Sequence, residues 1–270
     1  MDIKLIAVDM DGTLLDDRKR LPEGFFETVE RLAARGVRTV IASGRQYYNL
    51  LKRFEPIRDR LIFLCENGAL VFERDENLFR RAIPPDLLKK VLRSVSRIPD
   101  AKPVVSCVRT AYLADPGPEA ERNIAQYFER RTIVADPLEA ALAHDSAVKT
   151  AVYVAGAAAK FHPALKDEFG ADLAVVLAGE DWLDFMAPDV SKGAAIRFLQ
   201  RRLGLAPEQC MAFGDYMNDY EMLQSVHYGY AMRNGHPDLV ASARFVAPPN
   251  TENGVMRTIA ACFPDCVVGV

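Results

Sequence analysis

The chain places two acidic residues directly after a short apolar run at IKLIAVDMDGT, residues 3–13. The run 3–8 has the length and continuous apolar character of a strand buried on both faces of a parallel sheet. In open α/β sheets ligands bind outside the carboxyl ends of the strands, which is where Asp9 and Asp11 fall. Two carboxylates so close together repel each other, and a cation would relieve that repulsion. Hard oxygen ligands of this kind suit Mg²⁺.

A solvated Asp-Gly turn is the plain alternative for this stretch. A shuffled chain of the same composition would contain only about 0.003 matches to Asp-x-Asp-Gly-Thr, so chance is a poor explanation. The position of the motif at the end of a predicted strand also favours a functional site.

Strands and helices alternate on both sides of this motif, which predicts a doubly wound parallel sheet. In the first part of the chain we expect helices at 21–34 and 46–54 and strands at 38–42 and 61–64. The pattern returns after Pro188, with helices at 192–203, 219–224, 237–241 and 253–262 and strands at 211–213 and 228–232.

The middle of the chain has a different pattern, in which strands come in adjacent pairs beside helices. This is typical of an α+β module with an antiparallel sheet. We expect hairpins at 69–72/78–82 and 104–109/111–114, helices at 86–96, 119–130 and 158–169, and strands at 148–154, 173–177 and 182–186. The predicted domains are therefore a core made of 1–82 and 187–270 and an inserted domain at 83–186.

Composition excludes several classes of protein. The 270 residues are 50% hydrophobic and 26% charged with a net charge of −3, which is ordinary for a globular protein and not for a disordered one. There is no overall basic field for nucleic acid, and no apolar run approaches the roughly 18 residues of a membrane span. The amino-terminal residues do not resemble a signal peptide, and the five scattered cysteines fit reduced thiols. We therefore expect a cytoplasmic protein.

Three further motifs follow predicted strands or open a predicted helix. Ser43-Gly44 supplies a small hydroxyl group and backbone that an anion can approach closely, although Ser-Gly is also a common turn. Lys192-Gly193 puts a cation at a helix N-terminus, where the macrodipole disfavours it on stability grounds, so a functional charge is favoured. The third stretch is GDYMND, residues 214–219. Asp215 is a third carboxylate at the same sheet edge, and Asp219 is a candidate helix cap or ligand.

In this order, the four motifs resemble those of the haloacid dehalogenase (HAD) superfamily. The stretches Asp184…Val190-Ser191-Lys192-Gly193 and Glu66-Asn67-Gly68-Ala69 are similar to the Cof-type sugar phosphatases of subclass IIB. The resemblance implies a Mg²⁺-dependent phosphatase that forms a phosphoaspartate. A phosphatase is implied because the phosphohydrolases of the family carry the second aspartate that stands here at position 11.

The resemblance also implies roles for single residues. Asp9 would be the nucleophile, and Asp11 would protonate the leaving alcohol and then activate water. Mg²⁺ would be held by Asp9, the backbone carbonyl of Asp11 and Asp215. The expected phosphate-binding residues are Met10, Ser43, Gly44, Lys192 and Asn218. Position 216 usually carries Asn, Gly or Gln in the family and here carries Tyr, which leaves specificity open.

The spacing of the motifs locates the inserted domain. Only a loop and one helix fit between Asp11 and Ser43, whereas the segment from Ser43 to Lys192 is far longer than the dozen or so residues of a crossover. The insertion therefore follows the second motif, as in a type 2, C2B-like cap, which would close over the site and select the leaving group. The candidate side chains for the substrate face are Arg109, Tyr112, Lys149, Tyr153, Trp182 and Asp184. Ordinary packing or surface roles would also explain each of them.

The leading hypothesis is hydrolysis of small phosphorylated metabolites, sugar phosphates above all, with no nucleic-acid or membrane partner. A phosphomutase of the same cap class would use the same site but needs cap cations for a second phosphate. A phospho-accepting signalling module is a different class, and its usual length is nearer one domain. A non-catalytic binding protein is disfavoured because every catalytic position is filled.

Overall fold

The computed structural model describes residues 2–269, which form two compact units. Among the described residues, the first unit comprises 2–44, 53–78 and 191–269, and the second comprises Arg45–Lys52 and Phe79–Val190. The predicted domain boundaries at 82/83 and 186/187 each lie a few residues inside the second unit. The short segment Arg45–Lys52 was expected in the core, yet it groups with the second unit, where Gln46 exchanges two hydrogen bonds with the backbone of Arg130.

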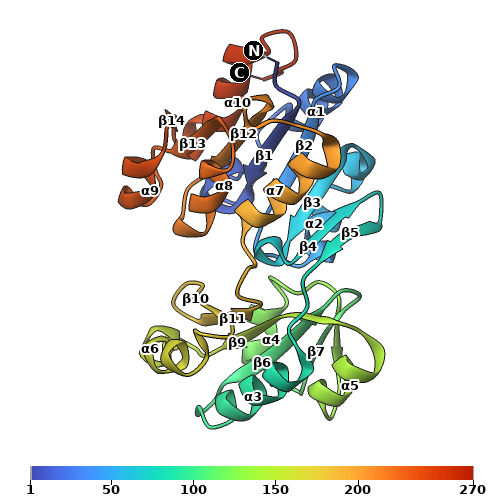
Figure 1. Cartoon of the computed structure of the whole chain (residues 1–270), viewed down its shortest axis with the longest axis vertical. Coiled ribbons are helices and arrows are strands. Elements are labelled where there is room, and N and C mark those ends of the chain that lie inside the picture. The colour runs from blue at the N-terminus through green and yellow to red at the C-terminus, as the bar shows by residue number, and fades with distance from the viewer. Residues whose placement is uncertain (1, 270) are drawn as a thin grey trace. The chain divides into compact units, whose positions relative to one another are not determined.

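An eight-stranded sheet forms the centre of the first unit, in the order β14-β13-β12-β1-β2-β3-β4-β5 (Figure 1). The six strands from β14 to β3 run parallel. The central strands are buried along their whole length, as their continuous apolar sequences predict. Their bounds are β1 Leu5–Asp9, β2 Arg38–Ala42, β3 Leu61–Cys65, β12 Cys210–Gly214, β13 Tyr228–Met232 and β14 Phe245–Ala247.

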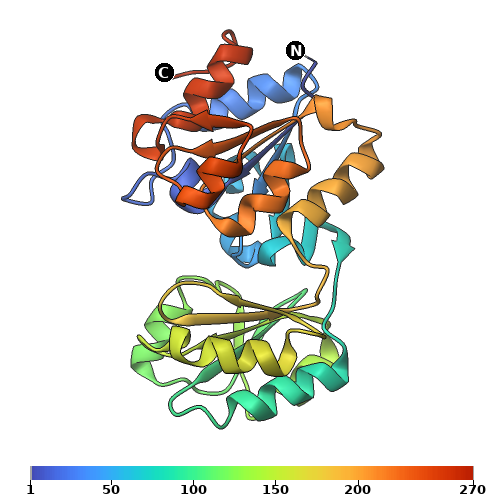
Figure 2. The same ribbon diagram turned by 60° about the vertical axis from the view of Figure 1, so that its left-hand side comes forward.

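Helices cover both faces of this sheet, which confirms the doubly wound arrangement. The connections on the two sides of β1 run in opposite directions across the sheet, so right-handed crossovers put their helices on opposite faces. Helices α7 and α8 pack against each other on one face, and α1 lies on the other (Figures 1 and 2). The helices of this unit are α1 Phe25–Ala34, α7 Lys192–Leu203, α8 Tyr220–Gln224, α9 Pro237–Ser242 and α10 Gly254–Cys262. Helix α2, Tyr47–Arg53, belongs mostly to the second unit.

Two local expectations for the first unit were wrong. The helix expected from residue 21 begins only at Phe25, because Pro22 belongs to a turn in which its carbonyl accepts the N–H of Phe25. The hairpin β4 Leu70–Glu73 and β5 Glu76–Arg80 is tighter than expected. Its two turn residues, Arg74 and Asp75, both have positive φ, the geometry of a type I′ turn that Asn-Gly usually signals.

The second unit holds a six-stranded sheet in the order β10-β11-β9-β6-β7-β8. It is antiparallel except for the pair β7–β8, which is parallel. Its elements are α3 Pro85–Val95, β6 Lys102–Cys107, β7 Ala111–Leu113, α4 Pro118–Ile124, β8 Arg131–Ile133, α5 Pro137–His144, β9 Ala147–Tyr153, α6 Ala158–Phe169, β10 Ala174–Leu177 and β11 Trp182–Met186.

Two apolar clusters stabilise the second unit. The larger contains residues of α3, α5 and α6 together with sheet residues such as Val152 and Phe185. The smaller contains Ile124 of α4, Phe128 and Trp182. Within residues 2–269 no helix is both long enough and apolar enough to cross a membrane.

Candidate active site

The carboxyl ends of three neighbouring parallel strands bring the first acidic motif and the GDYMND stretch together. Asp9 is the last residue of β1 and pairs in register with Ala42 of β2, directly before Ser43. On the other side of β1, Val8 pairs with Phe213 of β12, two residues before Asp215. The sheet therefore fixes Asp9, Ser43 and Asp215 at one edge, although they are far apart in the sequence.

The residues after β1 form one tight turn, Met10–Leu14. Gly12 is required in this turn, because its φ is +82° and a Cβ atom there would lie 2.3 Å from Oδ2 of Asp215. Thr13 donates a hydrogen bond from its hydroxyl group to Oδ1 of Asp215 at 3.0 Å. The backbone carbonyl of Gly12 accepts a hydrogen bond from Nδ2 of Asn234 at 2.8 Å. Two hydrogen bonds thus hold the turn in place, one to the candidate metal ligand Asp215 and one from Asn234.

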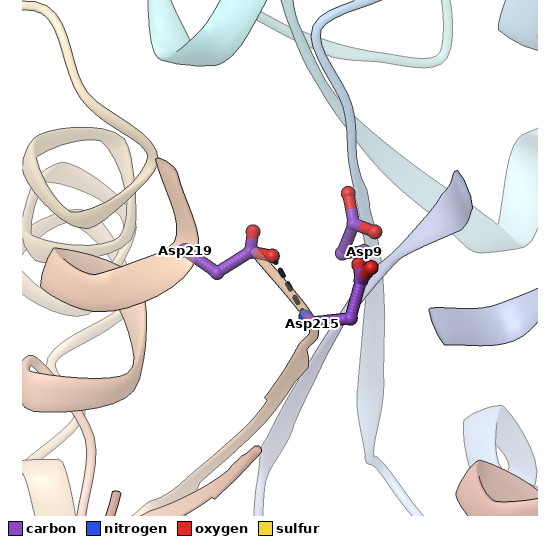
Figure 3. A group of neighbouring side chains, drawn as sticks. All are labelled: Asp9, Asp215 and Asp219. Atoms are coloured by element: carbon purple, nitrogen blue, oxygen red, sulfur yellow. Dashed lines mark hydrogen bonds between the residues drawn. The ribbon is translucent and has the colours of Figure 1, made fainter. Parts of the chain in front are cut away.

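Three carboxylates meet at the strand ends, those of Asp9, Asp215 and Asp219 (Figure 3). One oxygen of each lies within 4.8 Å of the others, which is close enough for a shared cation. Burial raises the pKa of Asp9 well above its usual range; the charge of Lys192 opposes this shift, while the charges of Asp219 and Asp215 add to it. Burial and the charge of Asp219 likewise raise the pKa of Asp215, while the hydroxyl of Thr13 opposes the shift.

The ammonium group of Lys192 bridges two of these carboxylates. Its Nζ atom lies 2.6 Å from Oδ1 of Asp9 and 2.6 Å from Oδ1 of Asp219, and all three side chains are buried. Burial by itself lowers the pKa of Lys192, but the charges and hydrogen bonds of Asp219 and Asp9 outweigh it, so the pKa lies above its usual value. Lys192 is therefore a charged group fixed beside Asp9.

Asp219, which the sequence analysis gave as a candidate helix cap or ligand, accepts hydrogen bonds within the site. Its Oδ2 atom accepts the backbone N–H groups of Asp215 at 3.0 Å and Tyr216 at 3.2 Å, while Oδ1 accepts from Lys192. It does not cap α8 with its side chain, so the helix-cap expectation was wrong. Since both of its oxygens already accept hydrogen bonds, Asp9 and Asp215 are better placed than Asp219 to coordinate a cation.

The expected phosphate-binding residues lie around this centre. Ser43 and Lys192 are buried. A Cβ atom on Gly44 would lie 2.9 Å from Oδ1 of Asn67, so Gly44 allows the close approach of that side chain. Asn218 donates from Nδ2 to the same Oδ1 atom at 3.3 Å. Met10 is fully buried, so only its backbone can serve a ligand.

The turn Glu66–Gly68 after β3 ties these motifs together. The backbone N–H of Asn67 donates to the carbonyl of Ser43 at 3.1 Å. Gly68 has φ +101°, and a Cβ atom there would lie 2.3 Å from the carbonyl oxygen of Ser191, the N-cap of α7. Asn67 and Asn234 were not chosen as site residues from the sequence. The Asn-Gly dipeptides 67–68 and 234–235 were the available signal.

Asp11 lies outside the buried cluster. Its carboxylate is partly exposed and accepts a hydrogen bond from Nζ of Lys19 at 3.0 Å. Lys19 has positive φ, and its carbonyl accepts a hydrogen bond from Arg53 at 2.8 Å. Lys19, in the loop after the first motif, thus places its ammonium group beside Asp11, the candidate general acid.

The six candidate side chains of the second unit do not form one group. Lys149 and Asp184 make a buried ion pair at 3.4 Å. Tyr153 and Trp182 have ring centroids 5.2 Å apart and belong to the smaller apolar cluster. Tyr112 instead packs against the larger cluster, and the side chain of Arg109 is exposed.

Comparison with known proteins identifies relatives of this chain. The model of the haloacid dehalogenase-like hydrolase family matches residues 6–259. A protein of Escherichia coli (strain K12) named 5-amino-6-(5-phospho-D-ribitylamino)uracil phosphatase is 30% identical over 261 residues, which cover 96% of each chain. A crystal structure of a Streptococcus mutans UA159 protein aligns with a TM-score of 0.86 at 26% identity, over 97% of this chain and all of the other. A HAD subclass IIB sugar phosphatase shares the fold, with a TM-score of 0.81 at 22% identity over 97% of this chain and 99% of its own.

Proposed function

Because the chain belongs to the haloacid dehalogenase-like hydrolases and is a Cof-type phosphoric monoester hydrolase, we propose that it hydrolyses small phosphorylated metabolites through a phosphoaspartate on Asp9. The observation that carries the proposal is the contact of Lys192 with the buried Asp9 carboxylate beside Asp215. Sugar phosphates are the substrates we expect, in a reducing, cytoplasmic setting. The five cysteines, all of them within the described residues, are free thiols, which is consistent with that setting.

In the first step Asp9 attacks phosphorus through a carboxylate oxygen, and the bond between phosphorus and the leaving oxygen breaks. Asp11 supplies the proton that the leaving oxygen needs to depart as an alcohol. Lys192 stabilises the negative charge of Asp9 and of the incoming phosphoryl group from a fixed position.

In the second step a water molecule attacks the phosphorus of the phosphoaspartate, and Asp11 takes up the proton of that water. The bond between phosphorus and Asp9 breaks, so phosphate leaves and the carboxylate is restored. Ser43, Asn218 and the backbone around Met10 and Gly44 are the groups we expect to hold the phosphoryl oxygens.

The donor set fits Mg²⁺, because the cluster offers hard carboxylate oxygens and a cation would offset the charge repulsion that helps to raise the pKa of Asp9 and of Asp215. The carboxylates of Asp9 and Asp215 and the backbone carbonyl of Asp11 would hold the ion. When bound, it would offset the repulsion between the nucleophile and the phosphoryl oxygens.

Hydrolysis of p-nitrophenyl phosphate with Mg²⁺ tests the proposal. Asp9→Asn should reduce kcat by at least about a thousandfold, while the exposed Asp172→Asn serves as a matched control and should be unaffected. Acid quenching of the wild type during turnover should trap phosphate on Asp9, detectable by mass spectrometry. Full activity of Asp9→Asn would exclude the mechanism. Turnover that depends on a sugar bisphosphate would favour the phosphomutase alternative.

A further inference from the structure

An exposed patch of large side chains directly follows the candidate metal ligand Asp215. Tyr216 is 56% exposed, Met217 42% and Tyr220 41%. Within residues 2–269, three of the exposed large hydrophobic side chains thus fall in one stretch of five residues. Such a cluster marks a surface that another molecule covers.

The backbone of Tyr216 is hydrogen-bonded to the candidate active site. Its N–H group donates to Oδ2 of Asp219, whose other oxygen accepts from Lys192. The adjoining carbonyl of Asp215 accepts the N–H of His236 at 2.7 Å. The position of Tyr216 is therefore coupled to the same groups that surround Asp9.

The ring of Tyr216 packs edge to face with the ring of His236, at a centroid distance of 5.5 Å and an interplanar angle of 87°. The His236 ring is itself fixed, because its Nδ1 atom accepts the N–H of Asp238 at 3.3 Å. The two rings form an aromatic corner whose larger member is mostly open to solvent. Aromatic surfaces of this kind bind flat rings by stacking or edge contacts.

We propose that this aromatic corner, Tyr216 with His236, binds a flat heteroaromatic ring in the leaving group of the substrate. The inference rests on the proposed function and narrows it to phosphomonoesters that carry such a ring, in preference to ring-free sugar phosphates.

Proximity favours a leaving group over a partner protein as the occupant. Tyr216 is the neighbour in sequence of Asp215, and an oxygen of Asp215 lies within 4.8 Å of one of Asp9. Asp215 and Tyr216 directly follow the end of β12, so the corner begins at the edge of the sheet where the phosphoryl group is expected. The uracil named in the substrate of the Escherichia coli relative is a ring of the required kind.

Uridine 5′-monophosphate and ribose 5-phosphate provide a matched pair of probes, because they share the phosphoribosyl group and differ by the ring. Their inhibition constants against p-nitrophenyl phosphate hydrolysis can be measured whether or not either is turned over. We expect the wild type to bind uridine 5′-monophosphate about tenfold more tightly, an effect of the size that base–aromatic stacking produces.

Tyr216→Ala should abolish this preference and leave the inhibition constant of ribose 5-phosphate within about twofold, whereas Tyr216→Phe should keep the preference. Val246→Ala is the control, since Val246 is an exposed apolar side chain on β14, outside this patch. Equal inhibition by both probes in the wild type, or an equal loss for both in Tyr216→Ala, would overturn the inference. Neither result would touch the proposed function, which depends on Asp9→Asn.

Discussion

Lys192 and Asp9 form a buried ion pair in which Nζ lies 2.6 Å from Oδ1, although 183 positions separate them in the chain. The first residue of α7 thus neutralises the last residue of β1. Asp219 shares the same ammonium group, so one cation serves two carboxylates. Because all three side chains are buried, removal of the cation leaves two buried carboxylates with less compensation.

Lys192→Met should therefore lower both stability and activity. We expect a loss of about 3–5 kcal/mol in the free energy of unfolding, as for the removal of one partner of a buried pair, together with loss of turnover. Urea unfolding and p-nitrophenyl phosphate assays measure the two effects. The exposed Lys166→Met is the control, and unchanged stability of Lys192→Met would contradict the buried pair.

Divalent cations should stabilise the protein through Asp215. Mg²⁺ at a hundredfold excess over its Kd contributes about 2.7 kcal/mol to the free energy of unfolding, which corresponds to a rise in Tm of several degrees. Asp215→Asn should abolish the rise and, without the metal, should unfold at a higher temperature than the wild type. Differential scanning calorimetry with EDTA and with Mg²⁺ gives both values.

The raised pKa of Asp215 also predicts a pH dependence for the metal-free protein. A carboxyl whose pKa is higher in the folded state stabilises the fold below its ordinary pKa of about 4, and this contribution is lost as pH rises through the folded-state value. The metal-free wild type should thus lose stability over this rise in pH relative to Asp215→Asn. Parallel pH profiles of the two proteins would contradict the assignment.

Gly12→Ala should damage the site more than an ordinary glycine substitution. The new Cβ atom would lie 2.3 Å from Oδ2 of Asp215. Gly36→Ala is a matched control, because Gly36 has a similar φ of +76° but nothing within 4 Å of its Cβ position. Both variants should lose about 1–2 kcal/mol from left-handed strain. Only Gly12→Ala should also lose the Mg²⁺-dependent rise in Tm and more than about tenfold in kcat.

Lys19→Ala should change stability by less than about 1 kcal/mol, because its pair with Asp11 is exposed to solvent. If Lys19 orients the carboxylate of Asp11, the variant should slow the hydrolysis of alkyl phosphates more than that of aryl phosphates, whose leaving oxygen needs less help from an acid. Steady-state kinetics with both substrate types decide this, with Arg18→Ala as the control. An equal effect on both types would exclude an orienting role.

Most of the fold could be predicted because periodicity and motif order are local properties of the sequence. The parallel strands of the first unit and the insertion after Ser43 follow from them. The elements that were missed are short or weakly patterned. Strands β8 and β14 have three residues each, and the Ala-rich α5 shows little contrast between its faces. Tertiary packing, rather than local preference, decides such segments.

The site was predictable to the level of residue types but not of contacts. The acidic motifs predicted that Asp9 and Asp215 lie close together, since strand ends of a parallel sheet meet at one edge. The role of Asp219 depends on the position of Lys192, which donates a hydrogen bond to it. The role of Asn67 depends on the turn that brings its backbone to Ser43. The Asn-Gly dipeptide at 67–68 signals the turn, but neither contact can be predicted from the local sequence.

The central position of β1 has a consequence for synthesis on the ribosome. This strand is made before the other strands of its sheet, yet one of its two neighbours is β12, Cys210–Gly214, which is translated after the whole second unit. The second unit has its own apolar clusters and can acquire structure while β1 still lacks that neighbour. We expect nascent chains that end before residue 210 to expose an unpaired, largely apolar strand edge and to depend on chaperones until β12 has been made.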